Sequence, residues 1–470
     1  MDIINYLKEH EHKDMLRFLT CGSVDDGKST LIGRMLYDSK MIFDDQLAAA
    51  ESESKKYGTT GEKIDMALLV DGLQSEREQG ITIDVAYRFF TTENRKFIIA
   101  DTPGHEQYTR NMVTGASTAD VAIILIDARK GILTQTRRHS FIVSLLGIKH
   151  IVVAVNKMDL VDFSEERYNE IAKAYSELAN ELGIKNTYYI PVSALDGDNV
   201  VDQSENTPWY DGKPLLSLLD TISLNPEPRA LNSESFRFPI QYVNRPNLDF
   251  RGFCGTIAAG SVKVGDEITV LPSGKTTKVK SIINAGDITE AHRDTTTTEV
   301  YAPMAITITT EDEVDISRGD MIVHTKNLPA VSNHLKVMLV WMDEKPMQLD
   351  RSYDIKRATS VVSGSFEHIN YKIDVNTYER EQVDTLELND IASCRMVLTR
   401  PIAADAYKTN RLTGSFIVVD RVTNNTVGAG MIVGLSRRDT TAPSKEYNEA
   451  EKALNAYIRE HYPEWDCKTI

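Results

Sequence analysis

The chain has few cysteines. Only four occur in 470 residues, and they are scattered, with no Cys-x-x-Cys pair and no histidine at metal-ligand spacing. This pattern argues against a disulfide framework or a zinc site, and it favours a reducing compartment. The four are Cys21, Cys254, Cys394 and Cys467.

Long apolar runs are also missing. The start of the chain, Met1–Met15, carries charges throughout and has no apolar stretch of the signal-peptide kind. The most apolar stretch, Val121–Ile126, lies between Asp120 and Asp127 and is far too short to cross a bilayer. We therefore expect a cytoplasmic protein with no membrane segment.

Positive charge is in deficit. Lysine and arginine number 53 against 69 aspartates and glutamates, so the formal charge is 53 − 69 = −16. Phosphate contacts along a nucleic acid require clustered lysines and arginines, and no long basic run is present. The charge argues against a broad nucleic-acid surface, although one local basic patch would be compatible with it.

The first half of the chain alternates between strand-like and helix-like segments. Helical patterns at Phe141–Leu146 and Tyr168–Leu182 separate short apolar or β-branched runs. This alternation predicts an α/β domain over residues 1–225, with a mostly parallel sheet and crossover helices. The predicted strands are Leu16–Thr20, Phe97–Ala100, Val121–Ile126, Ile151–Val155 and Tyr188–Val192.

The composition changes near residue 223. Residues 223–235 have the proline, asparagine and serine content of a linker, and short β-rich runs broken by turns follow it. Strands at this spacing predict two small β-barrels or sandwiches, and we expect β-barrel domains at 235–330 and 333–437. The apolar spacing in Glu446–Glu460 predicts a short helix within a tail over 438–470.

Residues 22–29 match the phosphate-loop pattern G-x-x-x-x-G-K-[ST] between a predicted strand and a helix at Thr30–Tyr37. The glycines allow a tight turn whose N–H groups face phosphate oxygens. Lys28 would bind the β- and γ-phosphates, and Ser29 would be a hydroxyl ligand for Mg²⁺. A glycine-containing strand-to-helix turn is the alternative. The candidate residues are Gly22, Ser23, Val24, Asp25, Asp26, Gly27, Lys28 and Ser29.

A second motif, Asp101-Thr102-Pro103-Gly104-His105, follows the predicted strand Phe97–Ala100. Asp101 would reach Mg²⁺ through water from the end of that strand. Gly104 would offer its N–H to the γ-phosphate. An ordinary Asp/Pro/Gly turn is the alternative, and the preceding strand argues against it.

Two further segments predict which base is bound. Asn156-Lys157-Met158-Asp159 follows a buried strand, and the Asp159 carboxylate can accept hydrogen bonds from N1 and the 2-amino group of guanine. Adenine lacks this pair of donors, so the motif selects GTP over ATP. Ser193-Ala194-Leu195 would place a backbone N–H near the guanine O6.

Gly274-Lys275-Thr276 looks like part of a second phosphate loop. However, its first glycine would fall at Thr269, and Pro272-Ser273-Gly274 is better interpreted as a hairpin turn. We therefore predict only one phosphate loop.

These motifs together resemble the translational GTPases, such as elongation factor Tu, over nearly the whole chain. The stretch Ser75–Ile83 is similar to the family's effector loop, and this similarity implies that Thr82 ligates Mg²⁺ in the GTP state. The histidine after Gly104 is similar to the family's residue that positions the attacking water, which implies that role for His105. The resemblance thus implies an α/β P-loop GTPase domain, with Lys28, Thr82 and His105 in catalysis and Ser29, Thr82 and Asp101 at the metal.

The chain also departs from elongation factors. Its phosphate loop reads Gly-Ser-Val-Asp-Asp-Gly, where elongation factors usually have Gly-His-Val-Asp-(His/Ser)-Gly. The runs at 241–253, 413–421 and 426–431 and the tail at 461–465 are similar to another branch, the GTPase (large) subunit of bacterial sulfate adenylyltransferase, or ATP sulfurylase. Bifunctional relatives carry an adenylylsulfate kinase after this tail. With no second phosphate loop before Ile470, we expect that activity to be absent.

The resemblance to this branch implies a function and a partner. The chain would hydrolyse GTP, with GTP/GDP and Mg²⁺ as cofactors. A smaller catalytic subunit would form adenylylsulfate and pyrophosphate from ATP and sulfate, as part of sulfate assimilation. The two chains would make a heterodimer or a higher assembly. Two alternatives stay open: a translational GTPase that binds tRNA and the ribosome, and a non-catalytic module with an inactive site.

Overall fold

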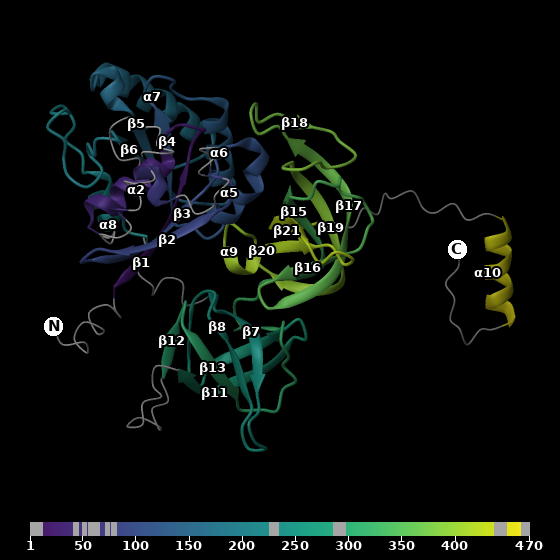
Figure 1. The fold of residues 1–470 in the computed structure, drawn as a ribbon. Helices are drawn as coiled ribbons and strands as arrows, with labels where there is room; N and C mark the ends of the chain where they lie inside the picture. The colour runs from purple at the N-terminus through teal and green to yellow at the C-terminus, as the bar shows by residue number, and fades with distance from the viewer. Residues whose placement is uncertain are drawn as a thin grey trace.

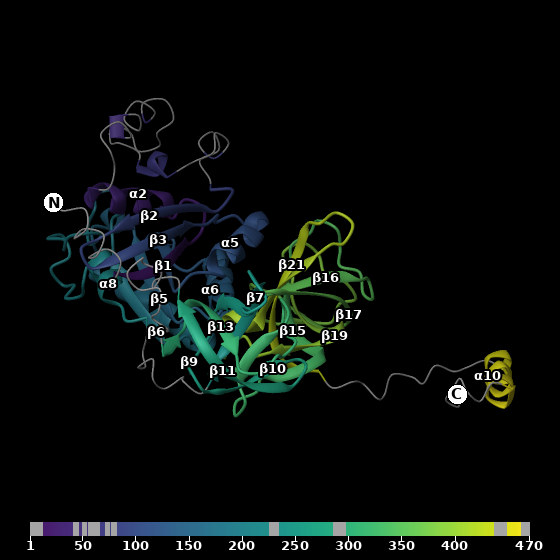
Figure 2. The ribbon, with the colours of Figure 1, turned by 90° about the horizontal axis from the view of Figure 1, so that it is seen from below.

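The computed structural model describes residues 13–40, 47–48, 54, 66–70, 76, 82–224, 235–284, 298–436 and 449–461. They form an α/β domain, two β domains and a terminal helix α10 (Glu449–His461), which is drawn apart from the three domains in Figures 1 and 2. The sequence pattern predicts a short helix over Glu446–Glu460, and α10 lies over the described part of that segment. Among these residues, no helix is long and apolar enough to cross a membrane.

The first domain is a six-stranded sheet of order β2-β3-β1-β4-β5-β6. All neighbouring strands are parallel except β2 and β3, so the predicted mostly parallel sheet is confirmed. Its strands are β1 (Asp14–Cys21), β2 (Ala86–Thr91), β3 (Arg95–Asp101), β4 (Val121–Asp127), β5 (His150–Asn156) and β6 (Asn186–Pro191).

Helices cover both faces of this sheet (Figure 1). In β4, Val121, Ile123 and Leu125 face one core, and the intervening residues face the other. All seven β4 residues are therefore buried, as expected for a strand between two helix layers. The helices are α2 (Lys28–Asp38) and α8 (Leu215–Thr221) on one face and α5 (Thr109–Ala116), α6 (Thr134–Leu145) and α7 (Glu165–Glu181) on the other, with short 3-10 helices η1 (Met66–Leu69), η2 (Glu106–Tyr108) and η3 (Met158–Val161).

Helix α6 begins earlier than the sequence pattern predicts. The predicted start was Phe141, whereas the helix begins at Thr134. Its first turns bury polar side chains, including Thr136, His139 and Ser140, so the apolar periodicity that marks a helix is absent there.

The second domain is a closed barrel of order β10-β11-β13-β8-β7-β14, which confirms the first predicted barrel. The Pro272–Gly274 segment is the turn between β10 and β11, as predicted, and Gly274 has a φ of +74° that suits glycine. The strands are β7 (Arg237–Asn244), β8 (Gly252–Thr256), β9 (Ser261–Lys263), β10 (Glu267–Leu271), β11 (Lys275–Asn284), β12 (Glu299–Tyr301), β13 (Ala305–Thr310) and β14 (Met321–His324).

The third domain is a sheet of order β16-β20-β21-β15-β19-β17-β18. Strand β16 also pairs with β17, so six of the strands close into a ring, which is the second predicted barrel. The elements are β15 (Ala330–Trp341), β16 (Tyr353–Arg357), β17 (Ser360–Ile373), β18 (Arg380–Glu381), β19 (Ile391–Ala404), α9 (Arg411–Gly414), β20 (Ser415–Val419) and β21 (Thr426–Leu435).

The third domain packs directly on the first (Figure 1). Buried residues of both domains, such as Val143 and Met342, belong to one continuous apolar core. The Tyr407 hydroxyl donates to the Leu146 carbonyl at 3.0 Å from within this contact. The α/β domain and the third domain are therefore joined by a shared core as well as by the chain.

The two β domains meet around a buried ion pair. Arg237 of β7 binds Asp405 with both ends of its guanidinium, with Nε–Oδ2 at 2.9 Å and Nη2–Oδ1 at 3.0 Å. The Thr413 hydroxyl donates to the same carboxylate at 2.7 Å. Both charged side chains are less than a tenth exposed, at 6% and 8%. The pair thus has the additional hydrogen bonds that a buried ion pair requires.

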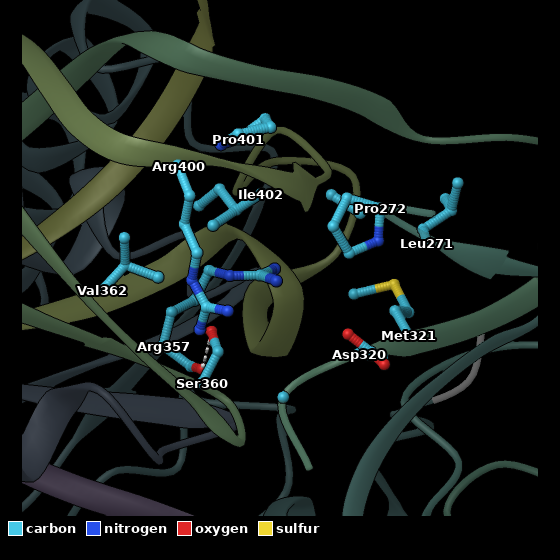
Figure 3. Close-up of a pocket in the computed structure, with 12 residues that line it drawn as sticks. Leu271, Pro272, Asp320, Met321, Arg357, Ser360, Val362, Arg400, Pro401 and Ile402 are labelled. Carbon is cyan, nitrogen blue, oxygen red and sulfur yellow. Dashed lines mark hydrogen bonds between the residues drawn. The ribbon is translucent and has the colours of Figure 1, made fainter. Parts of the chain in front are cut away.

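A small pocket lies near this junction (Figure 3). Pro272, Asp320 and Met321 line it from the second domain, and Arg357 and Arg400 line it from the third. Arg357 is buried and donates from Nη1 to the Thr413 carbonyl at 2.8 Å. Burial lowers the pKa of its guanidinium to about 10. Charged groups are therefore packed on both sides of the contact between the β domains.

Candidate functional site

The phosphate loop joins β1 to α2 at the carboxyl edge of the sheet. Gly27 has a φ of +90°, and a Cβ there would lie 2.5 Å from Asn156 Nδ2, so only glycine fits. Asp26 is buried, and its Oδ2 accepts the Ser23 N–H at 2.6 Å. Val24 is half-buried and Asp25 is exposed at the outer side of the loop. The Asp26 side chain thus holds the phosphate loop together through a hydrogen bond within the loop.

Lys28 points into the loop. Its ammonium donates to the carbonyls of Ser23 at 2.9 Å and Gly22 at 3.3 Å. Burial lowers the pKa of this ammonium, while the charges of Asp101 and Asp26 act in the opposite direction. Lys28 is therefore a buried cation that is held by backbone carbonyls of the predicted phosphate loop.

Four oxygen-bearing side chains converge beside Lys28. Ser29 Oγ donates to Asp101 Oδ2 at 3.0 Å and lies 3.4 Å from Thr82 Oγ1. Thr20 Oγ1 donates to the other Asp101 oxygen at 3.0 Å. Burial raises the pKa of Asp101, and Lys28 and these two hydroxyl donors oppose the rise. The predicted metal ligands Ser29, Thr82 and Asp101 are therefore brought together.

The segment after β3 turns toward the phosphate loop. Thr102 and Pro103 are buried, and the Thr102 hydroxyl donates to the Thr20 carbonyl at 2.6 Å. A Cβ on Gly104 would lie 2.6 Å from both Gly22 O and Lys28 Nζ. Gly104 thus lies directly against the phosphate loop.

His105 stands at the start of η2 and is half-buried. Its Nδ1 accepts the Gln107 N–H at 3.3 Å, and its ring lies 5.9 Å from that of Tyr108. Within the described part of the chain, no hydrogen bond joins His105 to Lys28, Ser29 or Asp101. His105 is therefore next to the cluster in the chain but not bonded to it.

The base-recognition segment follows β5. Asn156 links three segments, because its Nδ2 donates to the Asp26 carbonyl at 2.8 Å and its Oδ1 accepts the Ala194 N–H at 2.9 Å. Lys157 donates to the Asp25 carbonyl. Met158 is buried, whereas the Asp159 carboxylate is half-exposed and within reach of a ligand.

The Ser193–Leu195 segment follows β6 and lies beside Asn156. The Ser193 hydroxyl accepts the Asp196 N–H at 3.3 Å, so the turn is held locally. Arg34 of α2 donates to the carbonyls of Ala194 and Leu195 from the other side. Four of the predicted segments, 22–29, 101–105, 156–159 and 193–195, thus meet at one edge of the sheet, and Thr82 joins them.

Part of the predicted effector loop lies outside the described residues, namely Ser75 and residues 77–81. The described Glu76 accepts the N–H groups of Ile83 at 2.9 Å and Asp84 at 3.2 Å, next to Thr82.

Three supporting residues were not predicted from the sequence. Thr20 donates to Asp101, Arg34 holds the Ala194 turn, and Asp127 pairs with Lys157 at 3.2 Å. The place of Asp127 in the site could have been predicted, because a carboxylate directly after the buried run Val121–Ile126 lies at the same sheet edge as the other motifs. Thr20 also ends a predicted strand at that edge, but its pairing with Asp101, like that of Arg34 with residues 194 and 195, depends on a contact between distant segments.

Comparison with known proteins defines the class of this site. The family model "Elongation factor Tu GTP binding domain" matches residues 13–225, and "GTP-eEF1A C-terminal domain-like" matches residues 334–433. The first domain is therefore a guanine-nucleotide-binding domain of the elongation factor Tu type.

Full-length relatives identify the branch. The chain is 79% identical to "Sulfate adenylyltransferase subunit 1" of Sulfurovum sp. (strain NBC37-1), covering 100% of this chain and 98% of that protein. It is 59% identical to the protein of the same name in Aliarcobacter butzleri (strain RM4018), again covering 100% and 98%. The chain belongs to the sulfate adenylyltransferase subunit 1 family. A solved structure of sup35 complexed with GDP matches with a TM-score of 0.41 and 24% identity, over 92% of this chain and 96% of that one.

Proposed function

We propose that this chain binds GTP with Mg²⁺, hydrolyses it, and thereby regulates adenylylsulfate formation by a partner subunit. The observation that carries the GTPase part is the convergence of Lys28, Ser29, Thr82 and Asp101 beside the phosphate loop. These are a cation, two hydroxyls and a carboxylate, which is the set that binds nucleotide phosphates with their metal.

The residues fit a magnesium ion. Mg²⁺ prefers oxygen ligands and is commonly held by one or two carboxylates together with waters and substrate phosphates. Asp101 supplies one buried carboxylate, and Ser29 and Thr82 supply hydroxyl oxygens. Ser29 Oγ lies 3.0 Å from Asp101 Oδ2 and 3.4 Å from Thr82 Oγ1. When bound, the ion would neutralise charge on the β- and γ-phosphates. Its positive charge would also stabilise the ionised form of Asp101.

The other roles follow from position. Lys28 would bind the β- and γ-phosphates, and the backbone of Gly104 would contact the γ-phosphate. Phosphoryl transfer needs little covalent chemistry from the protein, so catalysis depends on positioning and charge stabilisation. His105, directly after Gly104, would orient the attacking water. Asn156 would hold the base segment while Asp159 accepts hydrogen bonds from guanine.

Replacing His105 by alanine should slow GTP hydrolysis about 10²-fold or more, on the scale of a positioned acid–base group. GTP affinity should change little, because His105 forms no hydrogen bond to the phosphate-loop lysine in the described structure. Single-turnover hydrolysis and equilibrium binding would measure the two effects. His368→Ala, at an exposed histidine of β17, is the matched control. An unchanged hydrolysis rate in His105→Ala would assign His105 a structural role.

The regulatory part of the proposal rests on the full-length relatives, which are named as one subunit of sulfate adenylyltransferase. A smaller catalytic subunit would convert ATP and sulfate into adenylylsulfate and pyrophosphate, and that reaction is thermodynamically unfavourable. A bound GTPase can assist it only if its nucleotide states differ in affinity for the partner's intermediates. Such coupling is reciprocal, so the partner's ligands must also change nucleotide affinity here.

Reconstitution tests the coupling. The isolated chain should hydrolyse GTP slowly and make no adenylylsulfate. Adding the catalytic subunit with ATP and sulfate should raise GTP turnover, and GTP should raise the yield of adenylylsulfate over that with GDP. Lys28→Ala, which removes the phosphate-binding cation, should abolish both effects. Equal yields with GTP and GDP would contradict the coupling and leave the GTPase assignment in place.

A further inference from the structure

Asp127 is a buried carboxylate at the carboxyl end of β4, and its side chain is 0% exposed. It accepts three hydrogen bonds from Arg129: the N–H at 2.9 Å and Nε at 3.0 Å on Oδ1, and Nη2 at 2.7 Å on Oδ2. Oδ2 also pairs with Lys157 Nζ at 3.2 Å. One buried carboxylate thus holds two cations from different segments.

Lys157 connects this carboxylate to the phosphate loop. Its ammonium lies between Asp127 and the Asp25 carbonyl, which is its second partner. Its backbone adopts the left-handed conformation, with φ at +63°, which is uncommon for lysine. The contacts run from β4 through the base-recognition segment to residue 25 of the phosphate loop.

The charge on Asp127 is maintained despite burial. Burial by itself raises the pKa of this carboxyl group, but the hydrogen bonds from Arg129 and the charge of Lys157 outweigh it and bring the pKa to about 2. The ionised carboxylate therefore exerts a steady attraction on Lys157 at neutral pH.

We infer that Asp127 is a positioning residue for the guanine nucleotide. By holding Lys157 against the phosphate loop, it connects the base-recognition segment to the phosphate loop and slows nucleotide release. This inference rests on the proposed GTP site. It differs from the role of Asp159, because Asp127 is buried behind Lys157 and has no exposed atom with which to contact a base. Its loss should therefore change the residence time of the nucleotide and leave the choice of base unaltered.

The test is Asp127→Asn, which keeps the shape of the side chain and removes its charge. Release of a fluorescent GDP analogue, followed by stopped flow, should be roughly 10- to 100-fold faster, the range for a lost hydrogen bond between charged groups. Competition with ATP and xanthosine triphosphate should show unchanged preference for GTP. Asp120→Asn is the matched control, because Asp120 precedes the opposite end of β4 and accepts the Arg17 N–H at 2.9 Å, far from the loop. It should alter thermal stability alone.

Two further variants separate positioning from local folding. Arg129→Gln removes a cation that is 46% exposed and leaves the Lys157 contact in place, so release should stay within about five-fold of wild type, as for partly exposed ion pairs. In a Lys157→Met background, Asp127→Asn should add little further effect, because both changes break one contact. Two results would overturn the inference. One is that the effects of Asp127→Asn and Lys157→Met on GDP release are additive. The other is that the Arg129→Gln protein releases GDP as fast as the Asp127→Asn protein.

The outcomes also distinguish this inference from the proposed function. If the wild-type chain bound no guanine nucleotide, the proposed function would fail and the inference with it. If the wild type bound GDP and Asp127→Asn released it at the wild-type rate while remaining folded, only the positioning role would be wrong.

Discussion

Replacing Asp159 by asparagine should weaken GTP binding about 10²- to 10⁴-fold. The carboxylate is half-exposed at η3, and it has no hydrogen-bonding partner among the described residues. It is therefore free to accept from N1 and the 2-amino group of guanine. Each hydrogen bond to a charged acceptor contributes about 1.5–3 kcal/mol, and about 1.4 kcal/mol corresponds to a factor of ten.

The same variant should gain affinity for xanthosine triphosphate, because the asparagine amide can donate to the 2-keto oxygen of xanthine. Equilibrium competition with GTP, ATP and xanthosine triphosphate measures both changes. Asp162→Asn is the control: this aspartate is exposed just beyond η3 and has a φ of +52°, which asparagine tolerates. Equal affinity of the wild type for ATP and GTP would contradict the role of Asp159.

Asp405→Asn should lower the free energy of unfolding by about 3–5 kcal/mol, the cost of breaking a buried ion pair by removing one partner. Asparagine retains the size of the side chain but leaves the Arg237 guanidinium buried without its counter-charge, in a site where the pair is 6% and 8% exposed. The Thr413 hydroxyl would lose a charged acceptor as well.

Denaturant unfolding and calorimetry would measure this loss, with the β-domain transition expected to shift more than that of the α/β domain. Asp354→Asn is the matched control in the third domain, because Asp354 pairs with Arg421 at the surface, where the side chains are 37% and 53% exposed. A surface pair of this kind contributes about 0–1 kcal/mol. Equal destabilisation by the two variants would show that burial of the Arg237 pair has no special importance.

The nucleotide-binding motifs could be predicted from the sequence because each combines a short local pattern with a strand before it. A predicted strand ends just before each of Gly22, Asp101 and Asn156, and parallel strands bring those ends to one edge. The meeting of four distant segments therefore follows from periodicity and topology.

Other features depend on contacts that the local pattern does not encode. Strand β2 (Ala86–Thr91) was not predicted; it is an antiparallel edge strand with Phe89 exposed, so it lacks the continuous buried run of its neighbours. The early turns of α6 were missed because polar residues fill their buried positions. The domain boundaries at 225, 235, 330, 333 and 437 and the roles of the individual site residues remain predictions.

Three side chains of the third domain donate hydrogen bonds to the backbone of the α/β domain. Tyr407, Tyr378 and Arg411 of the third domain donate to the main-chain carbonyls of Leu146, Arg137 and Ala119, at 3.0, 3.1 and 3.1 Å. A carbonyl group is the same whichever side chain its residue carries. Sequence drift at those three acceptor positions should consequently be tolerated wherever the backbone is preserved, whereas the three donors have no equivalent freedom. Arg138 of the nucleotide-binding domain is different, because it donates to the Asn376 side chain at 3.1 Å. At that point of the interface both side chains should be constrained together.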